Sequence, residues 1–171
     1  GDDYARYNLG LRYSTDDGVM IGSKRDRLSL FFKFSYNKPG AFSVNNSTTL
    51  MSVDSEESPY GSFSDYVMQN PYEQPYAADG SLHRKLSNQA GNFNKSENLN
   101  ILNTTTLQVW FSDAFRLNGD FSFTKDMSTS NNFKSPLALS ELNKTDVSQR
   151  GQLTESHTSL VRYAGKLMLS Y

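Results

Sequence analysis

Aromatic side chains interspersed with amides and carboxylates are the residues of this chain that best suit ligand binding. Four of them, Tyr60, Tyr66, Tyr72 and Tyr76, fall in one segment rich in Ser, Asn and Gly, and Trp110 is the single tryptophan. Such rings offer a flat apolar face and a polar tip, which suits stacking on a sugar ring. We therefore take these five residues as candidate contacts for a ligand or a partner protein. The interpretation we favour is structural, with the aromatic rings holding a long loop against its surroundings.

Other residue types offer less chemistry. Asp54, Glu56 and Glu57 supply the oxygen ligands that calcium takes, but they lack the spacing of an EF-hand, so a solvated acidic surface is favoured. His83 and His157 have no Cys, Asp or Glu at metal-ligand spacing, and the chain has no cysteine. There is no nucleophile elbow, glycine-rich phosphate loop or HExxH motif. The sequence therefore predicts no catalytic, cofactor or metal site, and no enzyme.

Composition narrows the class of protein. The 171 residues carry 17 basic and 18 acidic side chains for a net charge of −1, which gives no support to nucleic-acid binding. Hydrophobic residues make up 36% and the mean hydropathy is −0.62, and no run of about 18 apolar residues predicts a transmembrane helix. Aromatic residues reach 13%, which suits a β-protein, either a soluble sandwich or an outer-membrane barrel.

The stretch from residue 99 to residue 123 has the clearest pattern in the chain. Its odd positions, on both sides of the short segment 112–114, are mainly apolar. They hold Leu99, Ile101, Thr105, Leu107, Val109, Phe111, Phe115, Leu117, Gly119, Phe121 and Phe123. Because successive side chains of a strand point to opposite faces, this pattern predicts a β-hairpin with one apolar and one polar face.

The same alternation predicts an all-β, antiparallel, up-and-down sheet of about six strands. The strands lie near residues 4–13, 27–37, 41–53, 98–111, 115–126 and 157–171. In the third strand the alternation slips near Met51 and Val53, which predicts a β-bulge or the end of regular pairing.

The predicted connections differ greatly in length. Segments 37–40 and 112–114 are short turns, whereas 14–26, 54–97 and 127–156 are long loops. Short turns at one end and long loops at the other are typical of outer-membrane barrels. Six basic residues share the polar positions of their strands, where they would line a barrel lumen or cover the wet face of a soluble sheet. They are Arg6, Arg12, Lys33, Arg116, Arg162 and Lys166.

Several stretches resemble one family of outer-membrane proteins. They are YARYNL at 4–9, RLSL at 27–30, SPYGSFSDY at 58–66, NPY at 70–72, PYAADG at 75–80 and FKSP at 133–136. In order and spacing they are similar to the early barrel strands of TonB-dependent transporters of the SusC/RagA type from Bacteroidetes. The segment from 58 to 80 is the most specific of them.

The resemblance implies a function and a set of partners. Family members carry a plug inside a 22-stranded barrel, of which residues 1–171 would form about a quarter as a single partial segment. They import oligosaccharides or peptides across the outer membrane, under a SusD-like surface lipoprotein and driven by TonB. The plug and the TonB-contacting region are missing from these residues. We therefore expect a piece of barrel wall and extracellular mouth that meets membrane lipid, binds no nucleic acid and does not transport alone.

Two alternatives stay open at this point. One is a soluble cell-surface β-sandwich that binds carbohydrate through Trp110 and the tyrosine-rich loop. The other is a complete small barrel ending at Tyr171, although six strands are fewer than the eight of the smallest barrels. As an isolated fragment, the chain would expose two sheet edges and an apolar face, so we predict that it self-associates.

Overall fold

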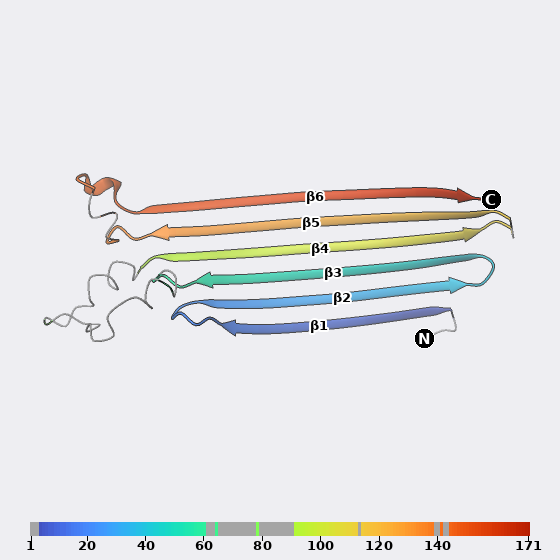
Figure 1. Cartoon of the computed structure of the whole chain (residues 1–171), viewed down its shortest axis with the longest axis horizontal. Helices are drawn as coiled ribbons and strands as arrows, with labels where there is room; N and C mark the ends of the chain where they lie inside the picture. Colours follow the sequence, from blue (N-terminus) through green and yellow to red (C-terminus); the bar gives the residue numbers. More distant parts are fainter. Residues whose placement is uncertain are drawn as a thin grey trace.

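The computed structural model describes residues 4–60, 64, 78, 91–112, 114–138, 141 and 144–171. These residues form six β-strands and one short 3-10 helix. The strands are β1 (Ala5–Asp17), β2 (Lys24–Lys38), β3 (Phe42–Glu57), β4 (Phe93–Trp110), β5 (Arg116–Lys134) and β6 (Gln152–Ser170), and η1 is Val147–Gln149. Every strand pairs antiparallel with the next, in the order β1-β2-β3-β4-β5-β6 (Figure 1). The predicted all-β, up-and-down sheet of six strands is confirmed.

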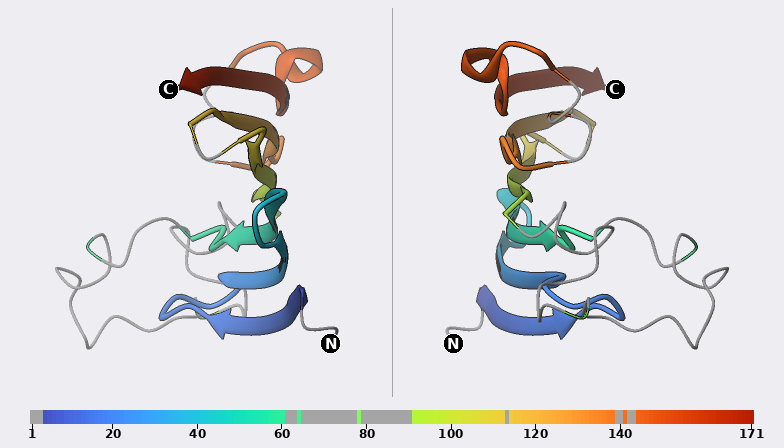
Figure 2. Two further views of the ribbon diagram at one scale, coloured as in Figure 1. Left: turned by 90° about the vertical axis from the view of Figure 1, so that its right-hand side faces the viewer. Right: turned by 90° about the vertical axis from the view of Figure 1, so that its left-hand side faces the viewer.

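The sheet is a single open layer. It begins with β1 and ends with β6, and these two strands do not pair with each other. The end-on views show the strands stacked one beside the next in one layer (Figure 2). A β-sandwich needs a second sheet, and the described residues form only one. In the described part of the chain no helix is long and apolar enough to cross a membrane.

Pairing is regular along β3, where the sequence predicted a bulge. The register with β2 and β4 continues without a break from Phe42 to Glu57. Met51 and Val53 therefore point to the face opposite that of Leu50. The prediction of a bulge is wrong because these two apolar residues belong to the other face of an unbroken strand.

Each strand extends further toward the long connections than the sequence predicted. The segment 14–26, predicted as a long loop, is mostly strand, with a turn at 18–23 closed by a 2.9 Å hydrogen bond from the Gly18 N–H to the Ser23 carbonyl. Gly22 takes a positive φ of 82°, which favours glycine there. Asp16 pairs with Arg25 in this extension. Polar side chains on both faces conceal the alternation there, although the backbone pairing continues.

The other connections keep their unequal lengths. Segments 58–92 and 135–151 replace the predicted loops 54–97 and 127–156, and segments 39–41 and 111–115 are the short turns at the opposite end. β1 begins and β6 ends at the end of the sheet with the short turns (Figure 1). The long connections therefore leave from and return to the opposite end of the sheet.

Candidate functional site

The register places the apolar positions of all six strands on one face, here called the apolar face. One cross-strand row of it contains Leu11, Leu30, Leu50 and Ile101. Leu11 is 70% exposed, whereas Leu30, Leu50 and Ile101 are half-buried, and the described residues form no second layer over this face. A continuous apolar face that is left partly exposed in this way marks contact with lipid or with another protein.

A polar cluster lies near the middle of the apolar face. It consists of Asn46, Thr48, Asn103 and Thr105, here called the Asn–Thr cluster. Asn46 Nδ2 donates to Thr105 Oγ1 (2.7 Å) and to Asn103 Oδ1 (3.4 Å). Asn103 Nδ2 donates to Thr48 Oγ1 (2.7 Å), and Thr48 donates to Asn46 Oδ1 (3.2 Å). Thr105 Oγ1 donates to Asn103 Oδ1 (3.3 Å). These side chains satisfy one another, which lowers the cost of polar groups in apolar surroundings.

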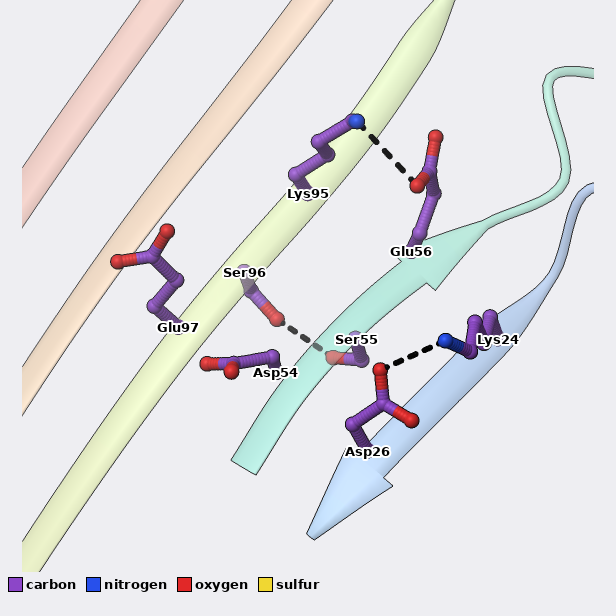
Figure 3. A pocket seen from close by; sticks show the side chains of 8 residues that line it. All are labelled: Lys24, Asp26, Asp54, Ser55, Glu56, Lys95, Ser96 and Glu97. Carbon is purple, nitrogen blue, oxygen red and sulfur yellow. Dashed lines mark hydrogen bonds and ion pairs between the residues drawn. The ribbon is translucent and has the colours of Figure 1, made fainter. Parts of the chain in front are cut away.

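The apolar face ends in charged residues near the long connections. Figure 3 shows a hollow there, with ion pairs between Lys24 and Asp26 (3.0 Å) and between Lys95 and Glu56 (3.2 Å). The hollow is lined by Lys24, Asp26, Asp54, Ser55, Glu56, Lys95, Ser96 and Glu97.

The acids considered as calcium ligands do not converge. Asp54 and Glu56 share this end of the apolar face, whereas Glu57 lies on the opposite face and accepts a 2.7 Å hydrogen bond from Asn94. His157 Nδ1 lies 3.0 Å from Thr129 Oγ1, and His83 lies outside the described residues. No cluster of metal-ligating side chains occurs among the residues that the structure describes.

The opposite face, here called the polar face, carries most of the positive charge of the sheet. It has nine cations: Arg6, Arg12, Arg25, Arg27, Lys33, Arg116, Lys134, Arg162 and Lys166. Its four carboxylates are Asp16, Glu57, Asp120 and Asp126. The apolar face has four cations, Lys24, Lys38, Lys95 and Lys125. Its six carboxylates are Asp17, Asp26, Asp54, Glu56, Glu97 and Glu155. The near-neutral chain is thus divided into a cationic face and a weakly anionic one.

The structure confirms that the six basic residues predicted on polar positions share one face. Three further cations of this face, Arg25, Arg27 and Lys134, were not predicted from the sequence. Arg25 and Lys134 fell in segments predicted as loops, and Arg27 was not assigned to a face of its predicted strand. Continuing the alternation of strand 28–36 toward lower residue numbers would have placed Arg25 and Arg27 on this face.

On the polar face of β5, Asp126 accepts hydrogen bonds from Arg162 of β6 (2.6 Å) and from Asn100 of β4.

The structure describes two of the five predicted aromatic contacts, Trp110 and Tyr60. Trp110 ends β4 on the polar face, opposite Arg116, and its backbone N–H donates to the Ala41 carbonyl (2.9 Å). Tyr60 follows the other end of β3, and its backbone N–H donates to Ser58 Oγ (3.3 Å). The length of β3 separates them, about 50 Å at 3.4 Å per residue. The two residues therefore lie at opposite ends of β3, and their roles as ligand or partner contacts stay predictions.

The remaining aromatic candidates, Tyr66, Tyr72 and Tyr76, lie outside the described residues. Comparison with known proteins adds no further guide: the chain matches no protein-family model, and no curated protein is significantly similar to it in sequence. The likeness to SusC/RagA-type transporters rests on the motifs quoted above.

The connection 135–151 has a buried acid at its centre. Glu141 is 4% exposed, and its carboxylate accepts hydrogen bonds from Lys144 Nζ (2.5 Å) and from the Gly151 N–H (3.1 Å). The Lys144 ammonium holds the pKa of Glu141 below its usual value, against the opposing effect of burial, and the Gly151 N–H adds to the lowering. Arg150 donates to the Lys144 carbonyl (3.0 Å). These contacts therefore join the centre of the connection to its C-terminal end.

Proposed function

We propose that the chain is a wall and extracellular-loop segment of a TonB-dependent importer of the SusC/RagA type in the outer membrane. Oligosaccharides are the proposed cargo. The observation that carries this proposal is the continuous apolar face across six strands whose other face is polar and cationic. A barrel wall needs this division, because one face meets lipid and the other meets water.

The height of the apolar face supports the proposal. On β2 it extends from Leu28 to Tyr36, beyond which Asp26 and Lys24 follow on the same face. Eight residue steps span about 27 Å along a strand, or roughly 20 Å across a membrane at a tilt of about 40°. The apolar band of outer-membrane barrels is about 25 Å tall. The charged end of the face then lies at the level of the lipid headgroups, next to the long connections.

The open edges fit a piece of a larger barrel. Barrels of this transporter class have 22 strands, so the six strands make up about a quarter of the wall. In the complete barrel β1 and β6 pair with further strands. The plug and its TonB contact belong to the part of the protein outside these residues, and a SusD-like lipoprotein covers the end with the long connections.

Light scattering on the purified 171-residue chain, with and without nonionic detergent, tests the proposal. We expect large aggregates or a defined oligomer in buffer, and detergent-bound particles when micelles are present. The apolar face and the two free edges must be covered in either case. A monodisperse monomer in buffer alone would contradict the proposal and return the chain to a soluble class of protein.

A further inference from the structure

The polar face of β1 and β2 has an unusual excess of unpaired positive charge. It carries five cations, Arg6, Arg12, Arg25, Arg27 and Lys33, against the single carboxylate of Asp16. Among the described residues, none of these five side chains is in an ion pair or a side-chain hydrogen bond. The Nε of Arg27 is buried without a hydrogen-bond partner. Unpaired cations held side by side attract an anionic ligand.

Four of these cations form two groups, and the fifth, Arg25, lies opposite Asp16. Arg6 and Lys33 are diagonal neighbours across the β1–β2 pair, and so are Arg12 and Arg27. Diagonal neighbours in an antiparallel pair have Cα atoms about 7–8 Å apart, close enough for two long side chains to reach one anionic group. The two groups stand about 20 Å apart along the strands, six residues at 3.4 Å each. The spacing suits an extended ligand with several anionic groups.

An aromatic ring lies between the two groups. Phe31 is opposite Gly10 in the β1–β2 pair and is 37% exposed. Gly10 has no side chain to stand beside Phe31, whereas a Cβ at position 10 would lie 3.9 Å from the Cβ of Phe31. One flank of the ring is therefore open. A flat apolar ring between cations is what a sugar ring with anionic substituents needs for stacking and for charge pairing.

We propose that the polar face of β1 and β2 binds an anionic oligosaccharide, one whose sugars carry carboxylate or sulfate groups. Arg12 and Arg27 bind one anionic group, Arg6 and Lys33 bind another, and Phe31 stacks on a sugar between them. This deepens the proposed import function and rests on it, because it assumes that the polar face lines the path of the cargo.

An oligosaccharide fits this surface better than an acidic peptide does. Extended peptides bind sheets mainly through backbone hydrogen bonds at a free edge. The face of a sheet offers side chains alone, since its backbone groups are paired within the sheet. Around Phe31 these side chains are hydroxyl and amide groups, with Asn8, Ser29 and Thr49 as the nearest examples by register.

Calorimetry on the 171-residue chain in nonionic detergent tests the proposal with three probes. They are tetragalacturonate, neutral cellotetraose and tetraglutamate. We expect tetragalacturonate to bind at least about tenfold more tightly than the other two and to weaken as salt rises. Equal affinity for cellotetraose, tighter binding of tetraglutamate, or no binding of any probe would overturn the proposal.

Two double variants locate the surface. Arg12→Gln with Arg27→Gln removes one cation pair, and we expect affinity for tetragalacturonate to fall at least about tenfold. Lys24→Gln with Lys95→Gln makes the same charge change on the opposite face and is expected to change affinity less than about twofold. Equal losses in the two variants would mean attraction by net charge alone and would overturn the proposal. Far-UV circular dichroism verifies that both variants keep the sheet.

A third variant tests the aromatic ring. Phe31→Leu keeps an apolar side chain but removes the flat ring, and we expect about two- to tenfold weaker binding of tetragalacturonate. An unchanged affinity would overturn the role of Phe31.

The binding measurements and light scattering together distinguish failure of the two proposals. If the chain is a monomer without detergent and still binds tetragalacturonate through Arg12 and Arg27, the import function fails and the binding surface stands. If the chain needs detergent and binds no probe, the surface fails and the import function stands.

Discussion

The two faces of this sheet are built from the same strands and differ in almost everything else. Phe31 and Phe32 are adjacent on β2 and nearly equally exposed, at 37% and 36%. Phe32 lies between Leu9 and Thr48 on the apolar face, whereas Phe31 lies between Gly10 and Thr49 on the cationic one. In a single-layer sheet, the exposed fraction of a side chain therefore does not tell whether that side chain meets water or lipid. The position of a residue within the strand period decides which surroundings it needs.

Each face also contains residues of the opposite polarity, and the two faces accommodate these residues differently. On the apolar face the Asn–Thr cluster pairs its own polar groups through five side-chain hydrogen bonds. On the polar face Val53 is 6% exposed, so its neighbours cover it, whereas Leu102 and Leu160 remain 40% and 46% exposed. Within the Asn–Thr cluster the polar groups satisfy one another, as expected if this part of the apolar face leaves water. Lys125, which lies between Ile101 and Val161 on the same face, has no ion pair or side-chain hydrogen bond among the described residues.

The largest expected effect comes from adding charge to one face at a time. Phe32→Arg places a guanidinium on the apolar face at mid-strand, and we expect the free energy of unfolding from lipid bilayers to fall by about 2–4 kcal/mol. Phe31→Arg is the matched control on the polar face, with an expected loss below about 1 kcal/mol. Denaturant titration in vesicles measures both losses. Equal losses would show that the two faces meet the same surroundings.

A smaller effect is expected from the Asn–Thr cluster. Asn46→Ala removes the hydrogen bonds that Asn46 makes to Thr48, Asn103 and Thr105 and leaves Asn103 as the remaining partner of both threonines. We expect a loss of about 1–3 kcal/mol in the free energy of unfolding. Asn45→Ala is the control on the polar face, where Asn45 accepts a 2.6 Å hydrogen bond from Ser35 and water can replace it; its expected loss is below about 1 kcal/mol.

Replacing the whole cluster sharpens this prediction. Asn46→Leu, Thr48→Val, Asn103→Leu and Thr105→Val together remove every polar side chain of the cluster. Because no donor or acceptor is then left unsatisfied, we expect the quadruple variant to recover most of the stability that Asn46→Ala loses. A quadruple variant less stable than Asn46→Ala would contradict a lipid-facing cluster.

The smallest effect is local to the connection 135–151, which neither face of the sheet supports. The folded-state pKa of Glu141 is lowered from about 4.5, so its contribution to order is present above that pH and is lost as the pH falls through the folded value. We expect the Gly151 amide to lose protection from hydrogen exchange as the pH falls below about 4.5, after correction for intrinsic exchange. In Glu141→Gln this pH dependence should disappear. Asp146→Asn, which removes the charge of the η1 N-cap but keeps an acceptor for the Ser148 N–H, is the control and should keep the pH dependence.

Much of the fold could be predicted from the sequence because period-two alternation is a direct signature of strands. The hairpin at 99–123 and the apolar strand at 28–36 were predicted with their faces, and the short turns at 37–40 and 112–114 predicted the pairing of the strands that they join. The strand ends were not predicted, since β1 and β2 carry polar residues on both faces near the turn at 18–23. The ends of these strands are set by backbone pairing, which the hydropathy pattern does not reveal.

The candidate surfaces were less predictable because they depend on cross-strand register. Asn46 and Asn103 lie far apart in sequence and meet only once β3 and β4 are aligned. Arg27 becomes a neighbour of Arg12 for the same reason. Trp110 and Tyr60 were considered together from residue type alone, and the length of β3 separates them. Residue types indicate which chemistry is available, and the register determines which of those residues meet.

The most direct test of the central claim measures the surroundings of each face residue by residue. The chain has no cysteine, so single cysteines carrying a nitroxide label can be placed at successive positions from 28 to 36 of β2. Spin-label accessibility in lipid vesicles then reports contact with oxygen, which concentrates in lipid, and with a water-soluble nickel complex. We expect oxygen contact to peak at Leu28, Leu30, Phe32 and Phe34 and nickel contact to peak at the positions between them. Nickel contact at every position, with no period of two, would contradict a wall that separates lipid from water.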